Sequence, residues 1–288
     1  MTGPVVVGLD GSPASVTAAW WAAREAVERH LPLLMLHSWT TQPLDVPIAQ
    51  EAHNKQRYGQ EVLTRVSAEL LHRHADLDLS TELVSAPAGQ ALLDRAEGAS
   101  LLVLGSRGHG SVASFLLGSI SLHVLGLAPC PAVAVRAGDP AVEAGWEHPA
   151  TADKNEVVVG LQHTGPDADP LLEFAFTTAA AHGHRLRAVT AVPLSTLVTS
   201  TAEDIEGQAR ARLAETLAPW REKFPDVPVI KHTAAGPAAQ VLLTASAHAC
   251  LAVVGRRRQP SRLTWKLGPV AHAALHHVPC PVAVVPNG

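Results

Sequence analysis

The chain repeats itself, and this repeat constrains its fold more than any other feature. The run Leu101-Leu-Val-Leu-Gly105 returns 150 positions later as Leu251-Ala-Val-Val-Gly255. The run Pro129-Cys-Pro-Ala-Val-Ala-Val135 returns at the same spacing as Pro279-Cys-Pro-Val-Ala-Val-Val285. The 288 residues therefore hold two tandem copies of one unit, each long enough to bury its own hydrophobic core.

The two copies are joined by a segment with scattered Pro, Gly and acidic residues. It reads AGDPAVEAGWEHPATAD over residues 137–153 and lacks hydrophobic periodicity, which is typical of a linker. We therefore predict a first domain over residues 1–137, a linker over 138–153 and a second domain over 154–288. An alternative for this segment is an extra surface element packed by Trp146.

Within each copy, short apolar runs alternate with longer helical patterns. In the first copy the expected strands cover residues 5–9, 33–37, 79–84, 101–104 and 132–135, and the expected helices cover 14–29, 50–74, 90–97 and 119–127. Such alternation is typical of βαβ units around a parallel sheet. Because the strand runs lack polar alternation, both faces of each sheet should be buried under helices. The predicted fold class is α/β, with two tandem doubly wound parallel five-stranded sheets.

The overall composition excludes several classes of protein. The 22 Lys and Arg against 26 Asp and Glu give a net charge of -4, so no global basic field is available to bind nucleic acid. The three cysteines form no C-x-x-C pair, which argues against structural zinc and fits a reducing compartment. The start MTGPVVVGLD lacks the pattern of a signal peptide, and the apolar stretch 114–136 is broken by His123 and by Pro129-Cys130-Pro131. We therefore expect a cytoplasmic chain with no membrane span.

A glycine-rich segment follows the fourth expected strand. Gly105-Ser-Arg-Gly108 is followed, nine residues later, by Gly118-Ser119 at the start of an apolar helix. Ligands of open α/β sheets bind at the carboxyl ends of strands, so this segment is a candidate site. Gly105 is expected to let the backbone pass close to a ligand, and Gly108 to adopt a positive φ. Gly118-Ser119 would offer N–H groups and a hydroxyl to a phosphate, and the alternative is a glycine-rich turn with Ser119 as an ordinary N-cap.

This pattern, G-x2-G-x9-G-[S/T] in a strand-loop-helix context, resembles that of the ATP-binding members of the universal stress protein family. The resemblance covers residues 3–136 and 155–286, and it includes the Val-Gly-Leu-Asp10-Gly-Ser run and the closing Pro-Cys-Pro strand. It implies an adenine-nucleotide-binding fold with strand order 3-2-1-4-5. The nucleotide-binding residues that it implies are Asp10, Ser38, Leu104, Gly105, Gly108, His109, Gly118 and Ser119.

Asp10 is the acidic residue of this set. By the resemblance it lies near the ribose and the metal-phosphate region, the backbone of Ser38 meets the adenine, and the implied cofactor is ATP with Mg. From the residues alone, Asp10 could accept from a ribose hydroxyl or face Mg²⁺, or it could form a turn before Gly11-Ser12-Pro13 and cap the next helix. The 16 histidines lack Cys or carboxylate partners at ligand spacing, so we favour surface or packing roles for them over a metal site.

The second copy departs from the pattern at the positions that matter for binding. Arg258 stands where the second glycine belongs, Pro269 replaces the serine, and Gln162 replaces the acid. Arginine resists a left-handed backbone, proline has neither N–H nor hydroxyl to donate, and glutamine supplies no carboxylate. We therefore expect at most one ATP of full affinity per chain. The run Arg256, Arg257 and Arg258 leaves open a different anion site in this copy.

The function that these features favour is an ATP-binding stress-response protein that acts as a nucleotide-dependent switch or interaction module. No catalytic set is evident: the chain has neither G-x4-G-K-[S/T] nor a G-x-G-x-x-G after its first strand. The alternatives are a slow ATP hydrolase or nucleotide-dependent transferase, and a scaffold that has lost its ligand. The two copies are expected to pack against each other as a pseudo-dimer, with further homodimer formation left open.

Overall fold

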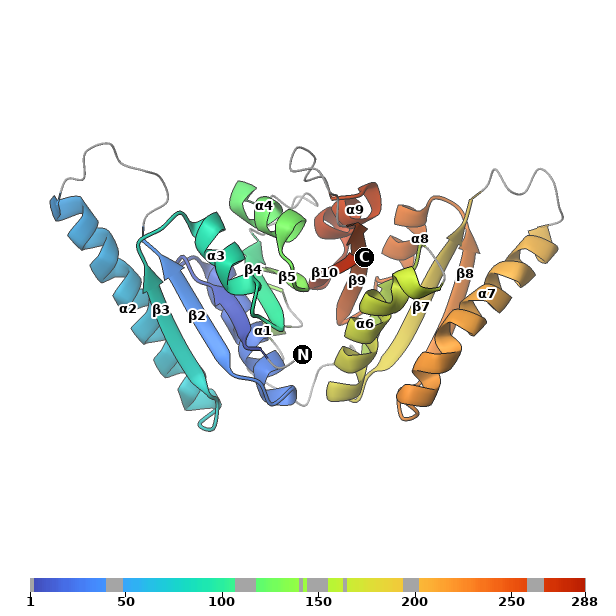
Figure 1. Ribbon diagram of the computed structural model, residues 1–288, viewed down its shortest axis with the longest axis horizontal. Coiled ribbons are helices and arrows are strands. Elements are labelled where there is room, and N and C mark those ends of the chain that lie inside the picture. The colour runs from blue at the N-terminus through green and yellow to red at the C-terminus, as the bar shows by residue number, and fades with distance from the viewer. Residues whose placement is uncertain are drawn as a thin grey trace. The chain divides into compact units, whose positions relative to one another are not determined.

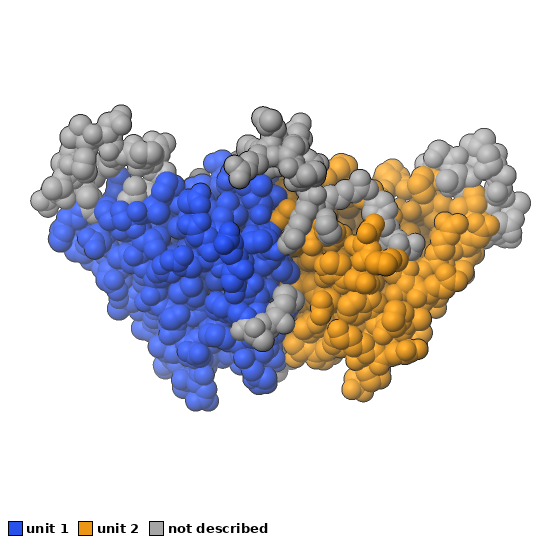
Figure 2. All heavy atoms as spheres, in the orientation of Figure 1, with its two compact units in different colours: residues 1–150 blue, residues 151–288 orange. Residues whose placement is uncertain are grey.

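The chain divides into two compact units, residues 1–150 and 151–288 (Figure 2), which we call unit 1 and unit 2. The computed structural model describes residues 3–39, 49–106, 118–139, 142–143, 155–162, 165–193, 202–257 and 267–287. Most of the predicted linker lies outside these residues, so the predicted domain limits stay a prediction. Within the described ranges, every helix is too short or too polar to cross a lipid bilayer.

Unit 1 alternates strands and helices as the sequence predicts (Figure 1). Its described elements are β1 (Val5–Gly8), α1 (Pro13–Glu28), β2 (Leu33–Ser38), α2 (Ala49–Arg73), β3 (Leu79–Val84), α3 (Ala88–Ala96), β4 (Leu101–Ser106), α4 (Ser119–Leu127) and β5 (Ala132–Arg136). The strands lie in the order β3-β2-β1-β4-β5, and neighbouring strands are parallel. The predicted strand order is therefore confirmed in this unit.

Unit 2 has the same plan. Its described elements are β6 (Glu156–Gly160), the 3-10 turn η2 (Pro166–Ala168), α6 (Asp169–Ala181), β7 (Arg185–Val192), α7 (Ala202–Lys223), β8 (Val229–Ala235), α8 (Ala238–Ala245), β9 (Leu251–Arg257), α9 (Pro269–His277) and β10 (Val282–Asn287). Its strand order is β8-β7-β6-β9-β10, again with parallel neighbours. The α/β fold class with two doubly wound sheets is thus confirmed.

The central strands are buried on both faces. In unit 1, α1 contacts α2 on one face of the sheet and α3 contacts α4 on the other (Figure 1). Val5, Val6 and Val7 of β1 are consequently fully buried, and the equivalent valines of β6 are as well. Burial on both sides explains why these strands are continuous apolar runs instead of alternating ones.

The strand register gives a residue-by-residue match between the two sheets. The pairs that define it are Val5 with Leu33 and Leu101 in unit 1, and Val157 with Leu186 and Leu251 in unit 2. The match extends to a helix contact. A Cβ on Gly8 would lie 3.0 Å from Leu92 Cδ2, and a Cβ on Gly160 would lie 3.2 Å from Leu242 Cδ1. In both units a leucine side chain therefore occupies the space above the glycine that ends the first strand.

Candidate functional site

A pocket of about 300 Å³ lies in unit 1 where β1, β2 and β4 end. Its volume is at the lower end of the range for small-molecule sites. It is lined by Gly8, Leu9, Asp10, Ser12, Ala14, Ser15, Leu36, Ser38, Ala88, Leu92, Leu104, Gly105, Gly118, Ser119, Ile120 and Ser121. The strand order reverses between β1 and β4, which makes this the topological switch point of the sheet. Open α/β sheets bind ligands at such a point.

Six of the eight predicted site residues line this one pocket. They are Asp10, Ser38, Leu104, Gly105, Gly118 and Ser119. The other two, Gly108 and His109, lie outside the described residues. The Ser38 hydroxyl donates to the backbone carbonyl of Ala86, which links the end of β2 to the residues before α3. The fold therefore brings together segments that are far apart in the sequence.

Asp10 shapes the turn between β1 and α1. Its Oδ1 accepts from the Ser12 N–H at 2.9 Å and from the Ser12 hydroxyl at 2.5 Å. Gly11 makes this turn at φ +83, which most side chains would resist. Ser12 is the N-cap, because its side chain accepts from the Ser15 N–H at 3.3 Å. Asp10 thus forms the turn, as one alternative held, but it does not itself cap α1. It orients the cap instead, and its carboxylate stays exposed at the pocket.

Gly105 is required by helix packing. A Cβ at this position would lie 2.6 Å from both the backbone C and O of Ala14, and 2.7 Å from the Ser15 N. No real Cβ tolerates such contacts with backbone atoms, which cannot move aside as a flexible side chain can. The packing of α1 is therefore a reason for this glycine that involves no ligand, because the start of α1 passes over the end of β4 at this point.

The first turn of α4 faces the pocket, since Gly118, Ser119, Ile120 and Ser121 all line it. Gly118 is the N-cap, with φ -61 and ψ 151, and it makes no side-chain capping bond. The alternative in which Ser119 caps this helix was therefore wrong. The first N–H groups of an α-helix have no partner inside the helix, so this turn presents donors and a positive dipole end to the pocket. A Cβ on Gly118 would meet no atom within 4 Å, so the space beside it is open.

Three hydroxyl residues of the pocket were not predicted from the sequence: Ser12, Ser15 and Ser121. The Ser121 hydroxyl donates to the Gly105 carbonyl at 3.4 Å, which connects α4 to β4. The available signals were the serine-rich start of α1 and the second serine of the Gly-Ser-Ile-Ser run. Neither signal reveals that the two helix starts meet at one pocket, because that depends on tertiary packing.

His37 lies beside this site without lining it. It is buried in β2, and its ring lies 6.1 Å from the ring of Tyr58 in an edge-on arrangement. Burial lowers the pKa of His37 below its usual value of 6.5, while a hydrogen bond to the Leu9 backbone and the charge of Asp10 oppose this shift. The imidazole is therefore held in its neutral form at neutral pH.

The comparison with known proteins agrees with this geometry. A model of the universal stress protein family matches residues 1–136 and 155–286. The chain belongs to the universal stress protein family. Universal stress protein Rv2005c of Mycobacterium tuberculosis is 33% identical over 97% of this chain and 96% of its own length. Universal stress protein Rv2623 of the same species is 30% identical over 97% and 95%. The structure of a universal stress protein from Archaeoglobus fulgidus shares the fold, with a TM-score of 0.77 and 19% identity over 99% of this chain and 98% of that one.

The second universal stress protein repeat lacks the carboxylate and the hydroxyls of the first at equivalent positions. By strand and helix register, Asp10, Ser38, Ser119 and Ser121 correspond to Gln162, Ala191, Pro269 and Ala271. The replacement at Ser38 and the replacement at Ser121 become visible only through this register. The carboxylate and three hydroxyls that unit 1 directs to its pocket are thus missing from unit 2.

Arg256 and Arg257, the first two residues of the arginine run in this second repeat, lie in a strand. β9 continues through Arg257 and pairs Arg256 with Pro286 and Arg257 with Asn287 of β10. Arg258 lies outside the described residues. Within the described part of the chain, no three His, Cys, Asp or Glu side chains are placed to hold a metal ion. The anion site stays a prediction.

Proposed function

We propose that this universal stress protein binds ATP in the pocket of unit 1 and acts as a nucleotide-dependent switch. The observation that carries the proposal is the convergence of the ends of β1, β2 and β4 and the first turn of α4 on one pocket. These are the segments in which the sequence resembles the ATP-binding members of the family. The interpretation needs no residue from unit 2.

The two ends of the pocket differ in chemistry, which suits a nucleotide. The α4 start supplies backbone N–H groups and the hydroxyls of Ser119 and Ser121, and such a helix start favours phosphate. Leu36, Leu92 and Leu104 add apolar surface of the kind that a base or ribose covers. Phosphates are therefore expected at the α4 start and the nucleoside against the leucines.

Asp10 fits a magnesium ion that arrives with the phosphates. Mg²⁺ in nucleotide sites is held by one or two carboxylates together with phosphate oxygens and water. Asp10 is exposed at the pocket, and the two donors of Ser12 fix its Oδ1, so the carboxylate is held in one orientation. A bound Mg²⁺ would neutralise phosphate charge, and Asp10 is the residue that would hold it.

The lining of the pocket supports binding over group transfer. Among the described lining residues, Asp10 is the sole ionisable side chain. Phosphoryl transfer depends on cationic groups that stabilise charge on the transferred phosphoryl, in addition to the metal. Serine hydroxyls and backbone donors hold a nucleotide without supplying that charge, so a switch is the function that this site supports best.

The direct test is to identify the small molecules that the full chain carries. The purified protein is denatured, the released compounds are analysed by mass spectrometry, and stripped protein is titrated calorimetrically with ATP, ADP and AMP in the presence of Mg²⁺. We expect an adenine nucleotide to be released and ATP to rebind without measurable phosphate release. Circular dichroism first checks that the stripped protein is folded. If none of the three nucleotides binds this folded protein, the proposal is wrong. Rapid phosphate release would favour the hydrolase instead.

A further inference from the structure

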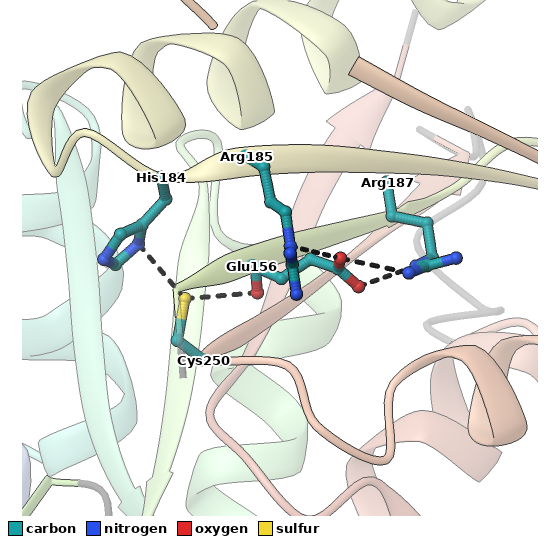
Figure 3. Close-up of polar contacts among 5 residues, drawn as sticks. All are labelled: Glu156, His184, Arg185, Arg187 and Cys250. Atoms are coloured by element: carbon teal, nitrogen blue, oxygen red, sulfur yellow. Dashed lines mark hydrogen bonds and ion pairs between the residues drawn. The ribbon is translucent and has the colours of Figure 1, made fainter. Parts of the chain in front are cut away.

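A charged cluster lies at the amino ends of the strands of the unit 2 sheet, whereas the unit 1 pocket lies at the carboxyl ends of its strands. It consists of Glu156, His184, Arg185, Arg187 and Cys250, which we call the Cys250 cluster (Figure 3). Glu156 begins β6, Arg185 begins β7, and Cys250 directly precedes β9. The cluster has no part in the nucleotide site, because that site lies in unit 1.

Cys250 has two polar contacts: the backbone carbonyl of Glu156 accepts from the thiol, and the ring of His184 can take up its proton. Its Sγ lies 3.3 Å from His184 Nδ1 and 3.2 Å from the backbone carbonyl oxygen of Glu156. Figure 3 shows the imidazole of His184 directed at the sulfur. The ring of His182 stacks on that of His184 with centroids 5.3 Å apart, which restrains the orientation of His184. A thiol and an imidazole nitrogen at this distance form a proton donor and acceptor pair.

The charged groups of the Cys250 cluster are a buried carboxylate and two arginines. The Glu156 carboxylate is buried and lies between two guanidinium groups, at 2.8 Å from Arg185 Nε and 2.6 Å from Arg187 Nε. One carboxylate against two arginines leaves a net positive charge before His184 is counted. Reactive cysteines are found in partly exposed, electropositive surroundings of this kind.

Neither the contacts nor the charges are required by the fold. By strand register the equivalent residues of unit 1 are neutral and are Pro4, Leu31, Pro32, Leu34 and Ser100. Unit 1 builds the same sheet with these residues. The Cys250 cluster is therefore an addition to unit 2, and its chemistry calls for a separate explanation.

Access distinguishes Cys250 from the other two cysteines. Cys130 is 7% exposed and Cys280 is 1% exposed, as expected for cysteines that act as small buried hydrophobes. Cys250 is partly exposed. Cys250 is therefore the cysteine that a small reagent is expected to reach first in the folded protein.

We propose that Cys250 is a reactive thiol that undergoes thiol–disulfide exchange with low-molecular-weight disulfides, with His184 as the proton acceptor. The Sγ proton moves to His184 Nδ1, and the resulting thiolate attacks one sulfur of the disulfide. A new S–S bond forms between Cys250 and that sulfur while the original S–S bond breaks. The departing thiolate takes the proton from His184. Cys250 is oxidised, the departing sulfur is reduced, and no further oxidant is needed.

The first test measures the thiols of the full chain with the aromatic disulfide dithiobis(nitrobenzoate), which releases a coloured thiolate on reaction. We expect one fast-reacting thiol in the native protein, mapped to the Cys250 peptide by mass spectrometry as a mixed disulfide. Cys250→Ser should remove the fast phase and Cys280→Ser should leave it unchanged. Equal reaction at all three cysteines, or a fast phase that maps elsewhere, would overturn the proposal.

The second test separates the proton acceptor from simple exposure. His184→Asn keeps a polar atom near the sulfur, but an asparagine amide cannot take a proton near neutral pH. His248→Asn is the matched control, because His248 is exposed and lies two residues from Cys250. An unassisted thiol is only a few per cent thiolate near neutral pH, so His184→Asn should slow the reaction by about tenfold or more. The rate should then rise with pH as it does for a free thiol. A rate and pH profile equal to those of the parent, with circular dichroism showing a folded variant, would refute the role of His184.

Discussion

The two units have the same sheet but carry their polar residues at opposite ends of it. Unit 1 places a carboxylate and several serine hydroxyls at the carboxyl ends of its strands, around a pocket. Unit 2 has lost these groups at equivalent positions and carries a thiol, an imidazole and an ion-paired glutamate at the amino ends. The residues that both units share are the apolar strand centres and the glycine–leucine contacts. Fold and site are thus specified largely by different residues, and Asp10 is a residue that contributes to both.

One pair of glycines shows that the same residue can be present for different reasons. Gly105 and Gly255 end equivalent runs of the sequence repeat. A Cβ on Gly105 would collide with the backbone of α1, whereas a Cβ on Gly255 would first meet the side-chain amide of Asn287. A backbone cannot give way, but the end of a side chain can rotate. Both repeats therefore have glycine at this position, but backbone atoms constrain it in unit 1 and a side chain in unit 2.

The largest expected effect in this comparison is on stability at these two glycines. Gly105→Ala places a methyl group against backbone atoms of α1, so we expect a loss of about 3 kcal/mol or a failure to fold. Gly255→Ala displaces the Asn287 amide and should cost roughly 1 kcal/mol or less. Urea unfolding of both variants measures the difference. Equal costs at the two positions would show that the α1 contact does not constrain Gly105.

The next largest effect is expected on nucleotide binding. Gly118→Val fills open space at the pocket, and its backbone at φ -61 accepts a side chain, so folding should be unaffected. We expect ATP affinity to fall by about 100-fold, or ~2.7 kcal/mol, because the valine occupies ligand volume. The matched control is Gly268→Val, the N-cap of α9, which also has open space and φ -60. Calorimetry that finds full affinity in Gly118→Val would remove this pocket as the site.

The difference between the units also predicts the number of sites. We expect titration of stripped protein to give one ATP per chain at full affinity. Losing a charge-assisted hydrogen bond costs roughly 1.5 to 3 kcal/mol, so the replacement of the Asp10 carboxylate and the Ser119 hydroxyl at the equivalent positions lowers affinity in unit 2 by at least about tenfold. Two equivalent sites per chain would contradict this and would direct attention to Arg256 as part of a different phosphate site.

The smallest predicted effect concerns pH. Burial lowers the pKa of His37 in the folded state, so the unfolded chain takes up a proton first as the pH falls below about 6.5. Stability that is present above this pH is then lost toward the lower folded-state pKa. Unit 2 has Thr190 at the equivalent position, so this loss belongs to unit 1.

His37→Gln tests this, because it removes the titrating group and keeps a polar side chain of similar size. Urea midpoints measured at about pH 7.5 and about pH 5 should differ less in the variant than in the parent. Some dependence will remain, since burial also lowers the pKa of His74. An unchanged difference between the two midpoints would show that His37 is not responsible.

The sequence predicted the elements, because these depend on local periodicity, and the family resemblance implied the strand order and six of the residues that line the pocket. It failed where tertiary contacts decide. The reason for Gly105 lies in the path of α1, and Ser12 and Ser121 meet only after two helix starts converge. Cys250 and His184 are 66 positions apart, and no periodicity relates them. Local pattern therefore predicts where a site forms but not which distant side chains complete it.

The turn at Asp10 has a consequence for how such repeats diverge. Its carboxylate fixes Ser12, the residue that begins α1, and the same carboxylate is the one offered to the pocket. A substitution of Asp10 is therefore expected to affect both ligand binding and the start of α1. Selection for either property preserves the residue for both. In unit 2 the acid is gone, and α6 follows a 3-10 turn that begins after Gly165 at φ +93. Unit 2 thus begins its first helix without an acid at the position of Asp10.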